Sequence, residues 1–156
     1  MQLVPVTTEH LKQMLTWFKS QQQVFQWAGP NFTYPYDLAS FTADLSLESL
    51  ASYALISDEQ ELLGFGQYYR RLEKCHLGRI VVNPSWRGKG ISKSLVVLIN
   101  NKGLKQLKLQ HSSLFVLKDN QAAIKSYLKL GFVVSLYPEP LPLEHCLYMT
   151  NENRQA

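Results

Sequence analysis

The chain has 156 residues, of which 46% are hydrophobic and 18% are charged. This length and composition suit one hydrophobic core, so we expect a single globular domain over residues 1–156 and exclude a disordered chain. The net charge of +4 and the pI near 9.1 are compatible with a phosphate-bearing ligand or with nucleic acid.

The sequence shows no membrane or targeting signal. No apolar run reaches the length of about 18 residues that a membrane-spanning helix needs, and residues 1–10 lack a signal-peptide pattern. We therefore predict a cytoplasmic protein without a membrane partner. The two cysteines, Cys75 and Cys146, match neither a disulfide framework nor a metal-ligand spacing, so we expect reduced cysteines on strands and no metal site.

Residues 2–6 are apolar and predict a first strand, followed by a helix that Thr7 or Thr8 can cap and that ends near Ser20. Residues 21–35 are rich in aromatic rings and contain Gly29, Pro30 and Pro35, which predicts a loop. This loop either lines a substrate cleft or closes one end of the core. A second helix is expected over residues 37–47.

Residues 51–57 and 62–69 are apolar or aromatic runs that flank a polar turn, which predicts a β-hairpin. Residues 74–82 supply a third antiparallel strand. Asn83 and Pro84 end that strand because proline has no backbone donor and disfavours helix before it.

Residues 77–93 form the junction around which the rest of the chain is organised. A buried strand runs into the glycine-rich turn 87–90, and apolar residues recur at helical spacing from Ile91 onward. The first turn of a helix has unpaired N–H groups and a partial positive charge, so it suits a phosphate or pyrophosphate. Neither the phosphate-loop pattern nor the dinucleotide fingerprint is present, so a nucleotide would be held in another way.

The second half of the chain continues this alternation of strands and helices. We expect a helix over 91–105 that Gly103 frays, a strand over 108–117 parallel to 77–82, and a helix over 120–130 that Gly131 closes. Strands at 132–137 and 144–150 complete the sheet. This order predicts a mixed α/β sheet with helices on both faces.

Two sequence blocks resemble one protein family. Residues 87–92, RGKGIS, resemble the Q/R-x-x-G-x-G/A signature of the GNAT superfamily of acyl-CoA-dependent N-acyltransferases, with Ser92 in place of glycine or alanine. Residues 120–132 resemble the family's N-x-x-A-x-x-x-Y-x-x-x-G-F block at every fixed position. The resemblance implies a GNAT-like fold, with a mostly antiparallel central sheet, a splayed pair of parallel strands and helices on both faces.

The resemblance also implies acetyl-CoA as cosubstrate and a role for each matched residue. Pantetheine would pair with the strand at Ile80, Val81 and Val82, where a backbone N–H polarises the thioester. Tyr127 would be the general acid, and Asn120 would cap its helix and bind pantetheine. The pyrophosphate would lie on the glycine turn and helix start, at Arg87, Gly88, Lys89, Gly90, Ile91, Ser92 and Lys93.

The general base remains open at this stage. Phe115 stands where some family members have a glutamate. His76 stands where others have one, and an imidazole can deprotonate an ammonium. An exposed strand histidine without a catalytic role is the alternative for His76. Glu73, His111 and a water chain are further candidates.

Three functions follow from these features. The first is an N-acetyltransferase that moves an acetyl group from acetyl-CoA directly to a primary amine of a small molecule or peptide, as a monomer or homodimer. The second is a domain that senses acyl-CoA without catalysis. The third, a nucleic-acid binder, has little support because the basic residues are scattered. The sequence does not indicate the acceptor.

Overall fold

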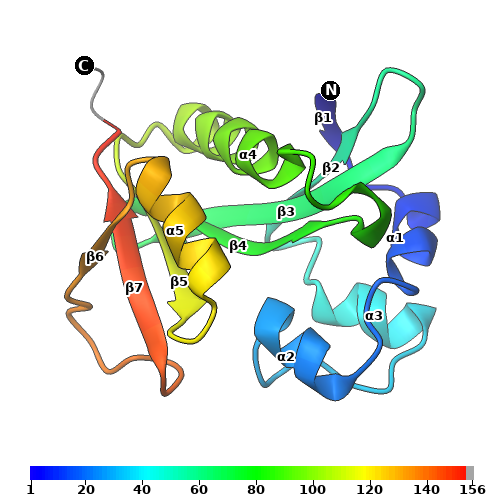
Figure 1. Cartoon of the computed structure of the whole chain (residues 1–156), viewed down its shortest axis with the longest axis horizontal. Coiled ribbons are helices and arrows are strands. Elements are labelled where there is room, and N and C mark those ends of the chain that lie inside the picture. Colours follow the sequence, from blue (N-terminus) through cyan, green and yellow to red (C-terminus); the bar gives the residue numbers. More distant parts are fainter. Residues whose placement is uncertain (154–156) are drawn as a thin grey trace.

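The computed structural model describes residues 1–153, which form one seven-stranded sheet in the order β1-β2-β3-β4-β5-β7-β6 (Figure 1). Within these residues only β4 and β5 pair in parallel. This confirms the predicted mixed α/β fold with one parallel strand pair. The elements in chain order are β1 (Gln2–Pro5), α1 (Thr8–Met14), α2 (Gln21–Ala28), α3 (Leu38–Asp44), β2 (Ala51–Ile56), β3 (Leu62–Arg71), β4 (Lys74–Val82), a 3-10 turn (Pro84–Trp86), α4 (Ile91–Leu107), β5 (Ser112–Leu117), α5 (Gln121–Lys129), β6 (Val133–Ser135) and β7 (Cys146–Asn151).

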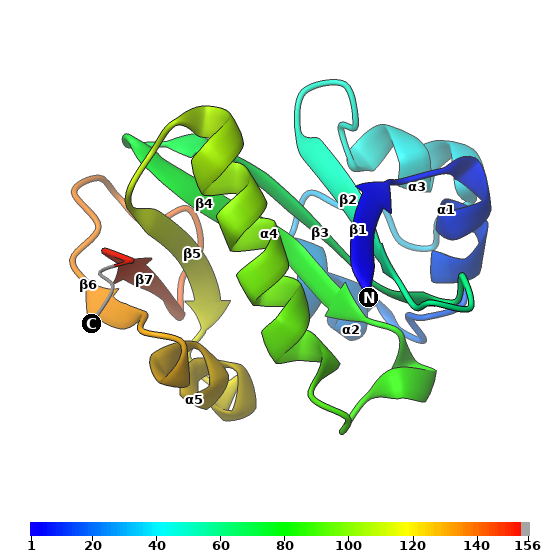
Figure 2. The ribbon, with the colours of Figure 1, turned by 90° about the horizontal axis from the view of Figure 1, so that it is seen from above.

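Helices cover both faces of the sheet, as Figure 2 shows from above. Side chains alternate between the faces along each strand, so β3 buries Tyr68 beneath α4 and Phe65 beneath α1 and α3. One hydrophobic cluster lies between the sheet and α4 and α5, and the other lies between the sheet and α1, α2 and α3. The sheet therefore separates two hydrophobic cores.

The expectation that Gly103 frays its helix is wrong. α4 continues to Leu107, and Gly103 is buried where the helix crosses the sheet. A Cβ at Gly103 would lie 3.0 Å from the Tyr68 ring and would clash with the Cys75 sulfur. Glycine is required here because α4 packs closely on β3 and β4.

Residues 21–28 form α2 instead of the expected loop, and the first helix is shorter than expected. Ser20 caps α2 by accepting a hydrogen bond from the Gln23 N–H at 3.2 Å, and Gly29 ends it with a φ of 82°. Val24 is buried on its inner side. Three helices therefore separate β1 from β2, because a cap before the glutamines and a glycine after Ala28 outweigh the ring-rich composition.

The helix predicted over 120–130 is confirmed as α5. Asn120 caps it by accepting from the Ala123 N–H at 3.3 Å. At its end Gly131 has a φ of 101°, and the Phe132 N–H donates to the Tyr127 carbonyl at 3.0 Å. This backbone pattern closes the helix and directs Phe132 into the core, where it is 1% exposed.

Cys75 lies on β4 and Cys146 on β7, and both are buried free thiols, as predicted. None of the helices in residues 1–153 has the length and apolar character needed to cross a bilayer. Over the same residues, His, Cys, Asp and Glu side chains do not gather in groups of three or more that could hold a metal ion.

Candidate active site

The parallel strands β4 and β5 pair only at their beginnings and then separate. Their register ends at Leu77 opposite Leu114. Immediately afterwards β4 contains a bulge: Gly78 pairs with Gln67 and Val81 pairs with Phe65, so two β4 residues face one β3 residue. Arg79, at the bulge, has a φ of 50°. A bulge bends its strand, and here it directs β4 away from β5.

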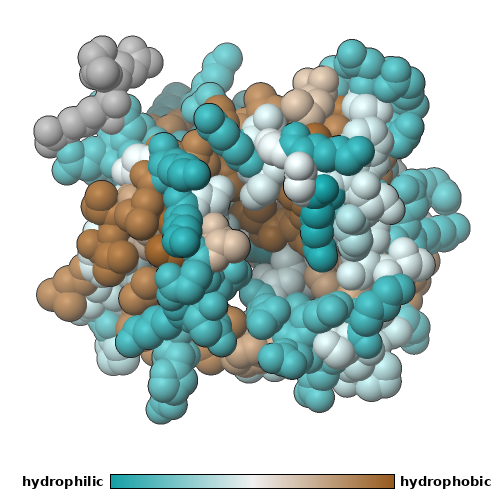
Figure 3. All heavy atoms as spheres, viewed as in Figure 1, coloured by the Kyte–Doolittle hydropathy of each residue, from teal (hydrophilic) through white to brown (hydrophobic). Residues whose placement is uncertain are grey.

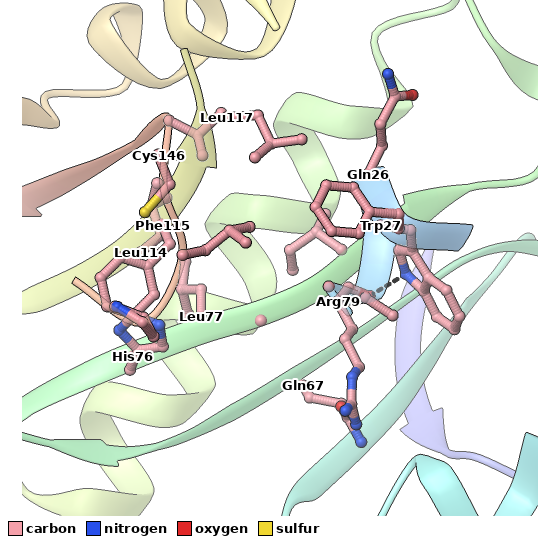
Figure 4. Close-up of a pocket in the computed structure, with 18 of the residues that line it drawn as sticks. Gln26, Trp27, Gln67, His76, Leu77, Arg79, Leu114, Phe115, Leu117 and Cys146 are labelled. Atoms are coloured by element: carbon pink, nitrogen blue, oxygen red, sulfur yellow. Dashed lines mark hydrogen bonds between the residues drawn. The ribbon is translucent and has the colours of Figure 1, made fainter. Parts of the chain in front are cut away.

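A cavity of about 510 Å³ lies where the strands separate. Figure 3 shows the surface hollowed near its centre, between the parts of the molecule that carry α5 and α2. The cavity is lined by α2 and the residues after it and by β3, β4 and β5. The start and middle of α5, residues before β7 and the first residue of β7 complete the lining. In the close-up of Figure 4, His76 and Phe115 lie on one side and Trp27 and Arg79 on the other.

His76 is a buried cavity residue with 3% exposure, so the alternative of an exposed strand histidine is wrong. Its Nδ1 lies 2.8 Å from the Ser113 hydroxyl, across the paired part of β4 and β5. The ring packs between Tyr69 and Phe115. Burial, together with the positive charge of Arg71, lowers the pKa of His76 to about 3. The imidazole is therefore neutral at pH 7 and holds a proton poorly.

Tyr127 extends from α5 into the cavity lining and is half-buried. Its ring meets Phe132 edge-on at a centroid distance of 6.0 Å. Burial raises the pKa of Tyr127 to about 12, so its hydroxyl is protonated over the physiological range. Within residues 1–153 this hydroxyl has no hydrogen-bond partner, which leaves it available to a ligand.

The glycine turn lies beyond the cavity, between the end of β4 and the start of α4. Gly88 and Gly90 have φ values of 78° and 76°, and a Cβ on either would meet nothing within 4 Å. Gly90 is the N-cap of α4, and no side chain caps that end. The first N–H groups of α4 therefore face open space, as an anion site requires.

The structure divides the residues predicted to bind a cofactor into three groups. Ile80 and Asn120 line the cavity with Tyr127 and His76. The side chains of Val81, Val82 and Ile91 pack into the cores, so only their backbone groups could contact a ligand. Exposed side chains on the turn and helix start do not line the cavity, namely those of Arg87, Lys89, Ser92 and Lys93.

The other two candidate bases lie away from the cavity. Glu73 is exposed and pairs with Arg70 at 2.9 Å. His111 is exposed just before β5 and contributes its backbone carbonyl, which accepts from the Cys75 N–H at 2.8 Å. Neither lines the cavity.

Sequence reasoning missed two cavity arginines, Arg71 and Arg79. A signal was present for Arg79, since it is the one charged residue in the mostly apolar run 77–82. Trp27, from the segment expected to be either a substrate wall or a core plug, packs against one core and also lines the cavity. Its ring stacks on Phe18 at 4.4 Å, and its Nε1 donates to the Arg79 carbonyl at 2.9 Å beside the cavity.

Comparison with known sequences agrees with this arrangement of strands, turn and helices. Residues 14–132 match the acetyltransferase (GNAT) family. The chain belongs to this family. That match includes the separated strands, the glycine turn and the whole of α5, and it confirms the resemblance seen in the two sequence blocks.

The curated GNAT relatives match over part of their length. Mycothiol acetyltransferase of Mycobacteroides abscessus is 38% identical over 79 residues, which cover 49% of this chain and 26% of that protein. Spermidine N(1)-acetyltransferase of Escherichia coli K12 is 35% identical over 74 residues, which cover 47% of this chain and 38% of that protein. The matched segment thus spans between a quarter and two fifths of these relatives.

Solved structures share the whole GNAT fold at low sequence identity. The spermidine N-acetyltransferase of Vibrio cholerae, in complex with CoA and spermine, superposes with a TM-score of 0.72 at 16% identity, covering 96% of this chain and 93% of that one. The ribosomal-protein-S18-alanine N-acetyltransferase of E. coli gives a TM-score of 0.66 at 20% identity, covering 99% and 95%. At these identities the likeness establishes the fold alone.

Proposed function

We propose that this GNAT protein transfers an acetyl group from acetyl-CoA directly to a primary amine of a small molecule or peptide. The observation that carries the proposal is the separation of β4 and β5 after Leu77, which leaves the β5-facing edge of residues 78–82 without a strand partner beside a cavity. An unpaired strand edge is where an extended ligand chain can add main-chain hydrogen bonds.

The residues present fit two parts of acetyl-CoA, the pyrophosphate and the pantetheine chain with its thioester. The uncapped start of α4 and the open backbone at Gly88 and Gly90 suit the pyrophosphate, with Arg87, Lys89 and Lys93 adding positive charge. The unpaired edge of β4 can pair with pantetheine, and a backbone N–H at the bulge can donate to the carbonyl oxygen of the thioester. Acetyl-CoA supplies the activated acetyl group.

Tyr127 serves as the acid for the departing sulfur. The amine nitrogen forms a bond to the acetyl carbon as the carbon–sulfur bond breaks, and the sulfur receives a proton from the Tyr127 hydroxyl, which solvent then restores. The raised pKa keeps the hydroxyl protonated but makes it a weaker acid than an ordinary phenol. Tyr127 therefore also lowers the barrier by donating a hydrogen bond to the thiolate as its negative charge develops.

Among residues 1–153, no strong base lines the cavity. The described lining residues include no carboxylate, and His76, whose pKa is about 3, is a weak base. We therefore assign His76 a role as a neutral hydrogen-bonding group that helps to orient the acceptor. The amine enters as its free base, and after attack the nitrogen releases one of its two protons to water and keeps the other in the amide product. The rate should then rise with pH up to the pKa of the acceptor amine.

The test combines calorimetry with turnover. Titration with acetyl-CoA and with CoA measures binding, and release of CoA is then followed against pooled primary amines and peptides. A pool of tertiary amines of similar size is the matched control. We expect acetyl-CoA to bind the protein and to be consumed only when primary amines are present. Absence of acetyl-CoA binding would contradict the proposal.

A second candidate, an acyl-CoA sensor without catalysis, is favoured by the same lack of a carboxylate in the cavity lining. The two candidates differ in one result. Acetyl-CoA binding without consumption in any pool would support the sensor and contradict the enzyme.

A further inference from the structure

The charge of the cavity bears on what the acceptor is. Among the described residues that line the cavity there are two arginines, Arg71 and Arg79, and there is no aspartate or glutamate. His76 in the same lining is neutral. The cavity therefore carries positive charge and offers no group that would hold a second ammonium of the acceptor.

Arg71 is held in a ring of aromatic side chains. Its Nη1 donates to the Tyr69 hydroxyl at 3.1 Å and its Nε donates to the Tyr137 hydroxyl at 3.2 Å. The guanidinium lies 5.1 Å from the centre of the Phe115 ring. Glu139 accepts from the Tyr137 hydroxyl at 3.5 Å but forms no ion pair with Arg71. Arg71 is thus positioned by neutral groups and keeps its Nη2 donors.

Arg79 has more unused donors. Its Nη1 donates to Gln67 Oε1 at 3.2 Å, and its guanidinium lies over Phe32 at 5.6 Å. Gln67 is 1% exposed and is fixed by the Leu45 carbonyl and the Ser52 hydroxyl. Within residues 1–153 the Nε and Nη2 groups of Arg79 have no partner. These two groups form one edge of the guanidinium, and that edge matches two oxygens of an anion.

Neither arginine has a carboxylate partner in the described part of the chain. Asp44 acts on Arg79 only from beyond ion-pair distance and uses its own Oδ2 to accept from the Thr33 N–H. Burial lowers the pKa of Arg79, an effect that Tyr69 and Asp44 partly oppose. A partly buried cation without a counter-ion is unfavourable unless a ligand supplies the opposite charge.

We propose that the acceptor is a primary amine that carries an anionic oxygen group, a carboxylate or a phosphate ester, which the free edge of Arg79 binds while Arg71 adds positive charge. This inference rests on the proposed function, because it names the substrate class of the same cavity. It excludes a polyamine such as spermidine as the preferred acceptor, since such a molecule would bring only cations to a positive cavity.

The test compares matched acceptors. Free L-amino acids are measured against their amides, phosphoethanolamine against ethanolamine, and spermidine alone. We expect at least one acceptor with an anionic group to exceed the matched acceptor without that group by roughly 30-fold or more in kcat/KM. Preference for the amino acids or for phosphoethanolamine distinguishes the carboxylate from the phosphate. Equal use of acids and amides, or preference for spermidine, would overturn the inference.

Variants locate the effect. Arg79→Gln should lower kcat/KM for the preferred acid by roughly 30-fold or more and leave its uncharged partner within about threefold, while Arg79→Lys should restore part of the loss. Arg70→Gln is the matched control, since Arg70 lies on β3 next to Arg71 but pairs with Glu73 outside the cavity. An equal loss for both acceptors in Arg79→Gln would show a purely structural role.

A binding measurement keeps this inference separate from catalysis. The protein saturated with CoA is titrated with N-acetyl amino acids and with their amides. Tighter binding of the acids, lost in Arg79→Gln, supports the anion site even where no turnover is seen. If the protein binds acetyl-CoA and acetylates only amines that lack an anionic group, the proposed function is retained and the anion site is overturned.

Discussion

The glycine turn before α4 and the cavity beside α2 are built in different ways. The turn presents backbone: two glycines with positive φ and an uncapped helix end, all within residues 87–93. The cavity presents side chains from six elements, among them Trp27 from α2, Arg71 from β3, Arg79 from β4 and Tyr127 from α5. A backbone site can be read from a short sequence segment. A side-chain site appears only when the fold brings distant segments together.

The two regions should therefore respond to different substitutions. Changes in the turn should alter acetyl-CoA affinity with little effect on the acetyl-transfer step. Changes in the cavity should alter turnover and acceptor choice. The first two substitutions below test this division, and two more test the roles given to His76 and Asn120, in order from the largest expected effect to the smallest.

Removing the Tyr127 hydroxyl tests the cavity. We expect Tyr127→Phe to lower kcat by roughly one to three orders of magnitude with little change in acetyl-CoA affinity, because only the proton donor is lost. Steady-state kinetics and calorimetry measure the two effects. Tyr34→Phe, which removes a hydroxyl outside the cavity lining, is the matched control. Unchanged turnover in Tyr127→Phe would remove this residue from the mechanism.

Adding a side chain at Gly90 tests the turn. We expect Gly90→Val to weaken acetyl-CoA binding by roughly tenfold or more, since valine disfavours a φ of 76° and covers backbone that the pyrophosphate would approach. Gly131→Val introduces the same kind of strain after α5 and serves as the control. If both variants bind acetyl-CoA normally, the pyrophosphate is not held at this turn.

The dependence of the free energy of unfolding on pH, below neutrality, tests whether His76 is neutral in the folded protein. Its pKa is about 3 in the folded protein and 6.5 when unperturbed, so the unfolded chain binds more protons between these values. This contribution to the free energy of unfolding is complete above pH 6.5 and is lost as the pH falls towards 3. The slope from this group is at most about 1.4 kcal/mol per pH unit.

Denaturant unfolding between pH 4.5 and 8 measures that slope. We expect His76→Gln to flatten it relative to the native chain, and we expect His111→Gln, at an exposed position, to leave it unchanged. An identical slope in His76→Gln and the native chain would mean that His76 titrates normally. It would then again be a candidate base.

Two substitutions of Asn120 distinguish its role as a helix cap from a role in cofactor binding, and the expected effect is the smallest of the four. We expect Asn120→Ala to lower the free energy of unfolding by about 1 kcal/mol because α5 loses its cap. Asn120→Ser keeps a capping oxygen and should retain most of that stability. If acetyl-CoA affinity falls in the serine variant as well, Asn120 also contacts the cofactor; normal affinity would limit it to the cap.

The same contrast explains what could be predicted from the sequence. The strands, the order of strand, glycine turn and helix at residues 77–93 and the end of α5 follow from local patterns and were confirmed, except that the strand predicted over 108–117 begins only at Ser112 because α4 extends to Leu107. The helix at residues 21–28 was missed because its cap at Ser20 and its end at Gly29 were given less weight than its aromatic composition. The burial of His76 was missed because it depends on Tyr69 and Phe115, which come from neighbouring strands.

Arg71 and Arg79 show a further limit of sequence reasoning. Nothing local indicates that Tyr69 and Tyr137, 68 positions apart in numbering, would hold one guanidinium between them. The bulge at Arg79 likewise depends on how β3 and β4 align. The chemistry of acceptor choice therefore depends on long-range pairing.

The two buried thiols give this fold two distinct chemical reporters. Burial raises the pKa of Cys75 to about 12, and Gly103 of α4 packs against its sulfur. Since the thiolate is the reactive form, alkylation of Cys75 requires α4 to leave the sheet and so measures opening of that core. Cys146 lines the cavity, and its alkylation should slow when a ligand fills that space. Peptide mapping of the two modified cysteines would therefore time unfolding and ligand occupancy separately in one sample.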